Sequence, residues 1–188
     1  MIISAKYLMT GDGKTVLEDK AVYVENGKIK KIASKEELMA EYPEAEVKEY
    51  GDATLLPGLC DMHVHLGYYY SQPDGFNYNN QLITLWALQH AQAAFERGIT
   101  SVRDLCSYKG ICKNLKVAEE KGFVKLPRIT HVDAGMCMTG GHGWDEVVEV
   151  DGPWEIRKEF VNSIVMVLSG LNFLQHTVHI FQNTLRKN

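Results

Sequence analysis

Three polar residues at alternating positions, Asp61, His63 and His65, are the part of this sequence best suited to metal chemistry. They lie in an apolar run, residues 59–66, that is typical of a buried strand. Alternate side chains of a strand point to one face and are about 6.5 Å apart. Two neutral imidazoles at that spacing can share a divalent ion. The pattern predicts His63 and His65 as metal ligands, with Asp61 orienting one of the rings. A coincidental His-x-His in a core strand is the alternative.

The elements that would position these residues alternate between strand and helix. Apolar runs predict strands at 59–66, 99–105 and 127–134, and helices at 79–97 and 109–121. A glycine-rich loop at 135–143 and a helix opening at Pro153 follow. This order predicts parallel strands joined by crossover helices. A (β/α)8 barrel takes about 250 residues, so we expect an incomplete (β/α)8 TIM-type barrel of three to four units, with its site at the carboxyl ends of the strands.

Residues 1–56 predict a separate small β unit. Strands are expected at 2–9, 21–25 and 28–33, with Asn26-Gly27 as a tight hairpin turn and a short helix after Ser34. One or two further strands follow at 47–56, and Pro57-Gly58 separates this unit from the barrel-type region. The predicted organisation is therefore a β unit at 1–56, β/α units at 57–160 and a divergent tail at 161–188. The tail has no charged residue before Arg186, and we interpret it as truncated or frame-altered.

Composition excludes several classes of protein. The chain has 188 residues, of which 45% are hydrophobic and 23% charged, values outside those of disordered and coiled-coil chains. A net charge of −4 argues against a nucleic-acid partner. Four cysteines without a Cys-x-x-Cys pair form no disulfide framework, which favours a reducing, cytoplasmic location. Polar residues interrupt the uncharged tail, so no membrane span is expected.

Three separate motifs resemble the amidohydrolase superfamily. The run Leu56-Pro-Gly-Leu-Cys-Asp-Met-His-Val-His-Leu66 resembles its P-G-x-x-D-x-H-x-H signature, and Gly98-Ile-Thr-Ser-Val-Arg-Asp-Leu105 its second-strand motif. The Gly-Gly-His-Gly run at 140–143 resembles a loop after the third strand in the imidazolonepropionase-like and Xaa-Pro dipeptidase-like branch of that superfamily. The resemblance covers about residues 1–160. It implies a (β/α)8 barrel flanked by a small β-sandwich, of which residues 1–56 would form half.

The resemblance also implies an activity and roles for particular residues. The activity is hydrolysis of an amide or peptide C–N bond, in a small-molecule amide or dipeptide, by a hydroxide bound to one or two divalent ions, with zinc expected. His63 and His65 match the first two metal ligands. His142, flanked by Gly141 and Gly143, matches a loop residue that faces the substrate and would help to hold a carboxylate. A surface loop histidine is the alternative for His142.

The sequence departs from the family in its last part. The family also has a carboxylated lysine on strand four, histidines on strands five and six, and an aspartate on strand eight that shuttles the proton. The stretch 162–174 contains no lysine, and no catalytic residue can be assigned. Two alternatives to an active hydrolase therefore remain open. One is a non-catalytic remnant, and the other is a binding or assembly module that forms homo-oligomers through the open edge of its barrel.

Some remaining residues carry purely structural expectations. Arg103 and Asp104 are predicted to form an ion pair at the barrel rim, since buried charges need partners. Trp86 and Phe123 are predicted to lie in the core, and Cys60 is expected to be a small buried residue.

Overall fold

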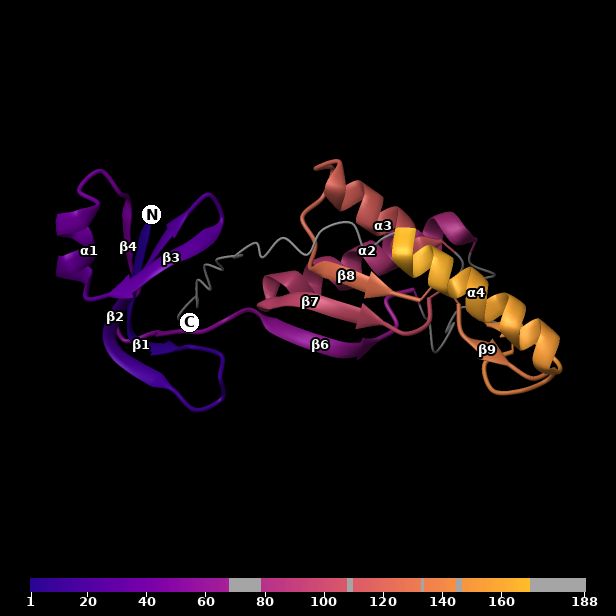
Figure 1. The fold of residues 1–188 in the computed structure, drawn as a ribbon. Coiled ribbons are helices and arrows are strands. Elements are labelled where there is room, and N and C mark those ends of the chain that lie inside the picture. The colour runs from indigo at the N-terminus through magenta and orange to yellow at the C-terminus, as the bar shows by residue number, and fades with distance from the viewer. Residues whose placement is uncertain (68–78, 108–109, 133, 145–146, 170–188) are drawn as a thin grey trace. The chain divides into compact units, whose positions relative to one another are not determined.

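The computed structural model describes residues 1–67, 79–107, 110–132, 134–144 and 147–169. These residues divide into two compact units, 1–58 and 59–169 (Figure 1). Residues 170–188, which make up most of the predicted tail, lie outside the described residues. No helix in the described ranges is long and apolar enough to cross a membrane.

The first unit is built on a mixed five-stranded sheet. Neighbouring strands run in the order β3-β2-β1-β4, and β5 also pairs with β1. The β1–β2 and β2–β3 pairs are antiparallel, whereas β4 and β5 pair with β1 in parallel. Asn26 and Gly27 form the predicted turn between β2 and β3, with positive φ angles of 50° and 71°. The strands are β1 Ile2–Met9, β2 Val16–Glu25, β3 Lys28–Ala33, β4 Val47–Glu49 and β5 Thr54–Leu55.

Both faces of this sheet carry buried apolar residues. Adjacent residues of β1 point to opposite sides, so each contributes to a different cluster. Ile2 belongs to a buried cluster with Leu38, which lies on the helix α1 (Lys35–Glu41). Ile3 belongs to a second cluster that includes Val22. Ser34 caps α1 by accepting a hydrogen bond from the backbone N–H of Glu37. The helix therefore covers one face and fixes the orientation of the sheet's first three strands around Leu38.

The second unit is a β-α-β-α-β arrangement around a parallel sheet, as the alternating pattern predicts. Its strands lie in the order β6-β7-β8, and their arrowheads point the same way in Figure 1. A short parallel pair, β9 and β10, was not predicted: β9 lies within the expected glycine-rich loop at 135–143, and β10 lies between that loop and the helix that opens at Pro153. The strands are β6 Leu59–Val64, β7 Ile99–Asp104, β8 Arg128–His131, β9 Met136–Cys137 and β10 Val148–Glu149, and the helices are α2 Asn80–Glu96, α3 Ile111–Glu120 and α4 Pro153–Ser169.

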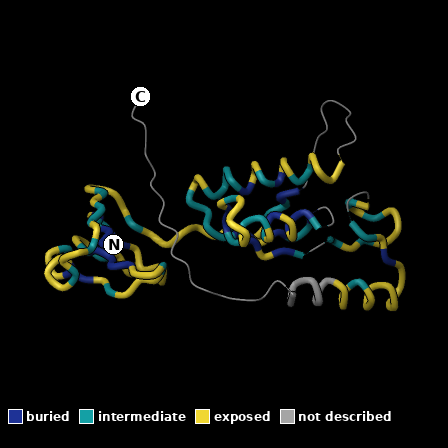
Figure 2. The backbone as a smooth tube through the Cα atoms, turned by 90° about the horizontal axis from the view of Figure 1, so that it is seen from above, coloured by how far each residue is buried: buried dark blue, intermediate teal, exposed yellow. Residues whose placement is uncertain are grey.

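The core of this unit lies between the sheet and the helices α2 and α3. Small residues of α2, Ala87 and Ala91, let that helix approach the sheet closely. They belong to one buried cluster with Val102 of β7, Ile129 of β8 and Leu115 of α3. In Figure 2 the described residues of α4 are mostly exposed, in contrast to those of β7 and β8. The parallel sheet is therefore anchored on its helix-covered face.

Three residues predicted to be buried lie at the surface instead. Trp86 is exposed because it neighbours Ala87, the residue of α2 that faces the core. Phe123 has 79% of its surface exposed, since it lies in the turn after α3 rather than on the helix. Cys60 of β6 is exposed as well. Its register partner Ser101 precedes the buried Val102, so Cys60 lies on the face of the sheet opposite the helices.

The predicted ion pair between Arg103 and Asp104 does not form. Consecutive residues of β7 point to opposite faces, so Arg103 is exposed and Asp104 is fully buried. Arg103 donates a hydrogen bond from Nε to the carbonyl oxygen of Met62, 2.9 Å away. Asp104 instead accepts hydrogen bonds from Leu66 and Ser107.

Candidate metal centre

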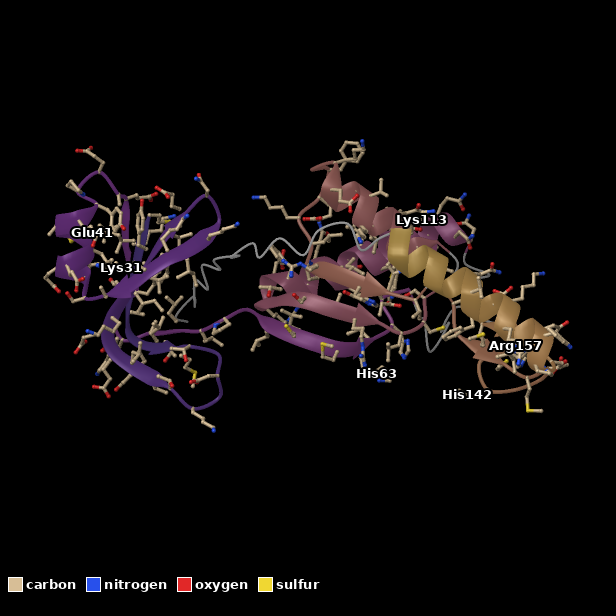
Figure 3. All side chains as sticks on the ribbon, viewed as in Figure 1. Lys31, Glu41, His63, Lys113, His142 and Arg157 are labelled. Carbon is tan, nitrogen blue, oxygen red and sulfur yellow. The ribbon has the colours of Figure 1, made fainter. Side chains whose placement is uncertain are left out.

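His63 and His65 lie together at the carboxyl end of β6. His63 is on the strand and His65 follows its last residue, Val64. Their ring centroids are 5.1 Å apart and their planes meet at 78°. His63 is exposed and His65 is half-buried, and Figure 3 shows His63 at the end of β6 toward which its arrow points. The structure thus brings the two predicted ligands side by side at the edge where a parallel sheet places its functional residues.

The ring of His65 is oriented by a backbone carbonyl. Its Nδ1 lies 3.0 Å from the carbonyl oxygen of Cys106, in the turn after β7. A carbonyl oxygen can only accept, so Nδ1 carries the proton and donates it. In the neutral ring Nε2 is then the unprotonated nitrogen. A metal-binding histidine is typically held in this way, with one ring nitrogen bonded to the protein and the other left for the ion.

Asp61 contacts the backbone of the histidine pair. Its Oδ1 accepts a hydrogen bond from the backbone N–H of His63 at 3.1 Å. The register of β6 against β7 shifts between Asp61 and Val64. This shift interrupts the strict alternation expected from residue 61 to residue 65. The carboxylate of Asp61 therefore fixes the main chain at His63, and the even spacing of three side chains on one face does not hold.

Two imidazoles do not complete a metal site. Among the residues that the structure describes, no three histidine, cysteine, aspartate or glutamate side chains are grouped so that they could hold an ion. Catalytic zinc sites have three protein ligands and a water. The donor chemistry of His63 and His65 fits a divalent ion, but further ligands would have to come from outside the described ranges.

His142 lies on a tight turn that follows β9. Its side chain is exposed, and Gly141 and Gly143 on either side are half-buried. Gly141 donates its N–H to the carbonyl oxygen of Met138 at 2.7 Å. A Cβ at position 141 would lie 2.8 Å from that same oxygen, so only glycine fits. Gly143 has a positive φ of 70°. The glycines therefore shape the turn, and His142 projects from it (Figure 3).

Two carboxylates later in the chain brace this turn, in that each accepts hydrogen bonds from its residues. Asp151 accepts hydrogen bonds from the backbone N–H of Thr139, at 3.0 Å, and from its hydroxyl. These bonds, the hydroxyl first, lower the pKa of Asp151. Glu149 accepts the N–H of Gly140 at 2.6 Å. The turn that carries His142 is thus fixed by hydrogen bonds at its first residues.

The sequence reasoning missed Cys106 as a partner of His65. The contact uses the main-chain carbonyl, so the residue type gives no signal. The only available signal was position, because Cys106 follows the second strand of the predicted parallel sheet and that strand was expected beside the first. The braces on the turn of His142 were missed for a similar reason, since acidic side chains such as Glu149 and Asp151 are common on any surface.

These observations define a class of protein: a mixed α/β chain with a histidine pair at the carboxyl edge of a parallel sheet. No model of a known protein family matches the chain. It is 30% identical to ochratoxinase of Aspergillus niger over 149 residues, which are 76% of this chain and 30% of that protein. It is 34% identical to imidazolonepropionase of Pyrobaculum arsenaticum over 82 residues, 39% of this chain and 21% of that protein.

The fold has relatives among solved structures as well. A Xaa-Pro dipeptidase with methionine bound in its active site matches with a TM-score of 0.68 and 25% identity, over 86% of this chain and 44% of that one. The chain belongs to the amidohydrolase superfamily. It spans less than half the length of each of these relatives.

Proposed function

We propose that this chain provides the first part of a metal-dependent hydrolytic site that cleaves an amide or peptide C–N bond. The observation that carries the proposal is the histidine pair: His63 and His65 are adjacent, and the hydrogen bond from Nδ1 of His65 to the Cys106 carbonyl leaves Nε2 as the unprotonated ring nitrogen, the form that can bind an ion. The relatives support the reaction class, since they include an imidazolonepropionase and a Xaa-Pro dipeptidase. The substrate would be a small-molecule amide or a dipeptide.

His63 and His65 would hold a divalent ion, for which zinc suits imidazole nitrogen. Such an ion supplies Lewis-acid activation of water and of the substrate carbonyl when bound. The braced turn would contribute His142, whose exposed ring can donate a hydrogen bond to a substrate carboxylate. Gly141 and Gly143 would let the substrate approach the main chain closely. Asp61 would keep the backbone of His63 in place.

On this proposal, residues 1–56 form half of a small β-sandwich and residues 57–160 the first units of a (β/α)8 barrel. The parallel order of β6, β7 and β8 supports the barrel, as does the likeness to the dipeptidase over 86% of the chain. The remaining ligands and the group that moves the proton would lie outside the described residues.

Metal analysis tests the proposal directly. The full chain is purified, loaded with Zn²⁺, dialysed and analysed for bound metal, and is then assayed with dipeptides and N-acyl amino acids. We expect retained zinc and turnover that stops when a chelator removes it. Protein that retains no more metal than a dialysed control, and turns over nothing, would contradict the proposal. Zinc retained without turnover would identify the chain as a non-catalytic member of the family.

A second candidate function, assembly with another chain, is supported by the edges of the parallel sheet. Within the described strands, β6 and β8 each pair on one side only. Leu59 and Met62 of β6 expose 51% and 55% of their surface. Unpaired strand edges and exposed apolar side chains favour association. Sedimentation over a range of concentrations tests this for a second copy of the chain, because a monomer at every concentration would exclude self-association.

A further inference from the structure

The last residue of β7 and the turn after it contain two polar side chains that are buried beside the metal-binding segment. Asp104 is fully buried and Ser107 is 2% exposed. Oδ2 of Asp104 accepts hydrogen bonds from the backbone N–H of Leu66, at 2.7 Å, and from the hydroxyl of Ser107, at 2.6 Å. The same hydroxyl oxygen accepts the N–H of Gly67 at 3.0 Å. The two residues that directly follow His65 are therefore held by this carboxylate–hydroxyl pair.

The contact between these segments leaves little room for movement. A Cβ on Gly67 would lie 3.3 Å from Cδ1 of Ile111 and 3.4 Å from the Cβ and Oγ of Ser107. The contact with Ile111 is slightly tighter than ordinary van der Waals packing, and those with Ser107 are at its lower limit. Gly67 thus allows the close approach, and a displacement of Ser107 would be transmitted to the main chain beside His65.

The same turn also contacts the chain that leads to His142. Its second residue, Cys106, accepts the Nδ1–H of His65 on its carbonyl oxygen. The Sγ of Cys106 accepts the N–H of Gly135 at 3.4 Å, just before β9. A Cβ on Gly135 would lie 3.2 Å from that sulfur. The turn therefore lies between the two segments that carry the candidate site residues.

We infer that Asp104 and Ser107 are positioning residues for His65. By holding Leu66 and Gly67, they keep the ring where Nδ1–H reaches the Cys106 carbonyl, which selects the tautomer with an unprotonated Nε2. A buried carboxylate is costly unless it is hydrogen-bonded. The Oδ2 of Asp104 accepts from Leu66 and Ser107, whereas its Oδ1 has no partner among the described residues. The tautomer itself does not depend on a metal. Only the use of Nε2 to bind an ion rests on the proposed function.

Nitrogen NMR of the metal-free full chain tests the inference. Long-range ¹H–¹⁵N spectra at alkaline pH report which ring nitrogen carries the proton, and the variant H65Q assigns the signal of His65. We expect the Nδ1–H tautomer in the natural chain. In S107A, which removes the hydroxyl, the opposite tautomer should rise at least threefold. D104N keeps one acceptor oxygen and should show a smaller rise.

Thr84→Ala is the matched control, because it removes a hydroxyl that bonds the carbonyl of Asn80 within α2, in the same unit. It should leave the tautomer of His65 unchanged. If circular dichroism shows that S107A does not fold, D104N takes its place as the test variant. Ser107→Thr, which retains a hydroxyl, is then compared with it. Natural tautomer ratios in a folded S107A, or in D104N when S107A is unfolded, would overturn the inference.

A zinc titration of the same proteins separates this inference from the proposed function. The affinity of S107A should fall about tenfold, the usual scale for groups that orient a ligand. If the natural chain binds no zinc but shows the Nδ1–H tautomer that S107A loses, the proposed function fails and the positioning role stands. If zinc binds and neither tautomer nor affinity responds to the variants, the positioning role fails alone.

Discussion

The imidazoles of His63 and His65 meet edge to face, with centroids 5.1 Å apart and planes at 78°. In this arrangement the rings do not stack, and the edge of one ring points toward the face of the other. The pair is created by the end of β6 and by the Cys106 carbonyl that holds His65. Both candidate ligands therefore depend on how β6 and β7 lie against each other.

Replacing either histidine should reduce metal binding. In H63Q and H65Q we expect zinc affinity to fall by at least tenfold, since a loose site loses one of its two described donors. Isothermal titration with Zn²⁺ measures this. H90Q is the matched control, because His90 lies on α2 in contact with Trp86. Equal affinities in all three variants would show that zinc binds elsewhere.

The brace on the turn of His142 should depend on pH. Hydrogen bonds from Thr139 lower the pKa of Asp151. A lowered pKa in the folded chain means that the charged carboxylate stabilises the turn above its ordinary pKa of about 4, and that this stabilisation is lost as pH falls through the lowered value. ¹³C NMR titration of the carboxyl group measures the shift. T139V should raise the pKa toward the ordinary value, whereas T139S should not.

Gly141 should be irreplaceable within its turn. In G141A the new Cβ would lie 2.8 Å from the carbonyl oxygen of Met138, so the turn must open. We expect a loss of about 1–3 kcal/mol in local stability, seen as faster amide hydrogen exchange at Gly141 and its neighbours. His142→Ala, which changes an exposed side chain on the same turn, should leave that exchange unchanged. Equal exchange in both variants would mean that the turn relaxes without cost.

Leu38 should be the most sensitive position of α1. It is fully buried among residues that include Ile2 and Tyr23. Leu38→Ala leaves a cavity and should cost about 2–5 kcal/mol of the free energy of unfolding. Hydrogen exchange of the β1 and β2 amides measures this loss within the first unit. Met39→Ala, at a position 45% exposed, is the control and should change stability by less than about 0.5 kcal/mol.

Local sequence signals predict the elements of this fold well. Asn26-Gly27 and the apolar residues around it predict β3 at its observed bounds, Lys28–Ala33. Ser34 predicts the start of α1, and Gly98, with φ of 90°, marks the end of α2. These signals work because turn and cap residues have steric requirements that depend only on their near neighbours.

Contacts between distant segments are not visible in such signals. The register shift between Asp61 and Val64 depends on pairing with β7, and it breaks the alternation that the spacing alone implies. The ion pair expected of Arg103 and Asp104 failed because Asp104 finds donors on the segment after β6. The group that bonds His65 is a backbone carbonyl, which every residue has, so the type of residue gives no signal of it. The histidine pair itself was predictable, but its support was not.

The supports of the two histidine segments lie downstream of them in the chain. The Cys106 carbonyl is 41 residues beyond His65, and Asp151 is 12 residues beyond Thr139. During synthesis on the ribosome, the histidines therefore leave the exit tunnel before the groups that hold them. His65 gains a defined ring orientation only after β7 has emerged, and the turn of His142 gains its braces soon after its own glycines. A zinc ion that reached the chain during synthesis would therefore find the two histidines before the ring of His65 has its orientation.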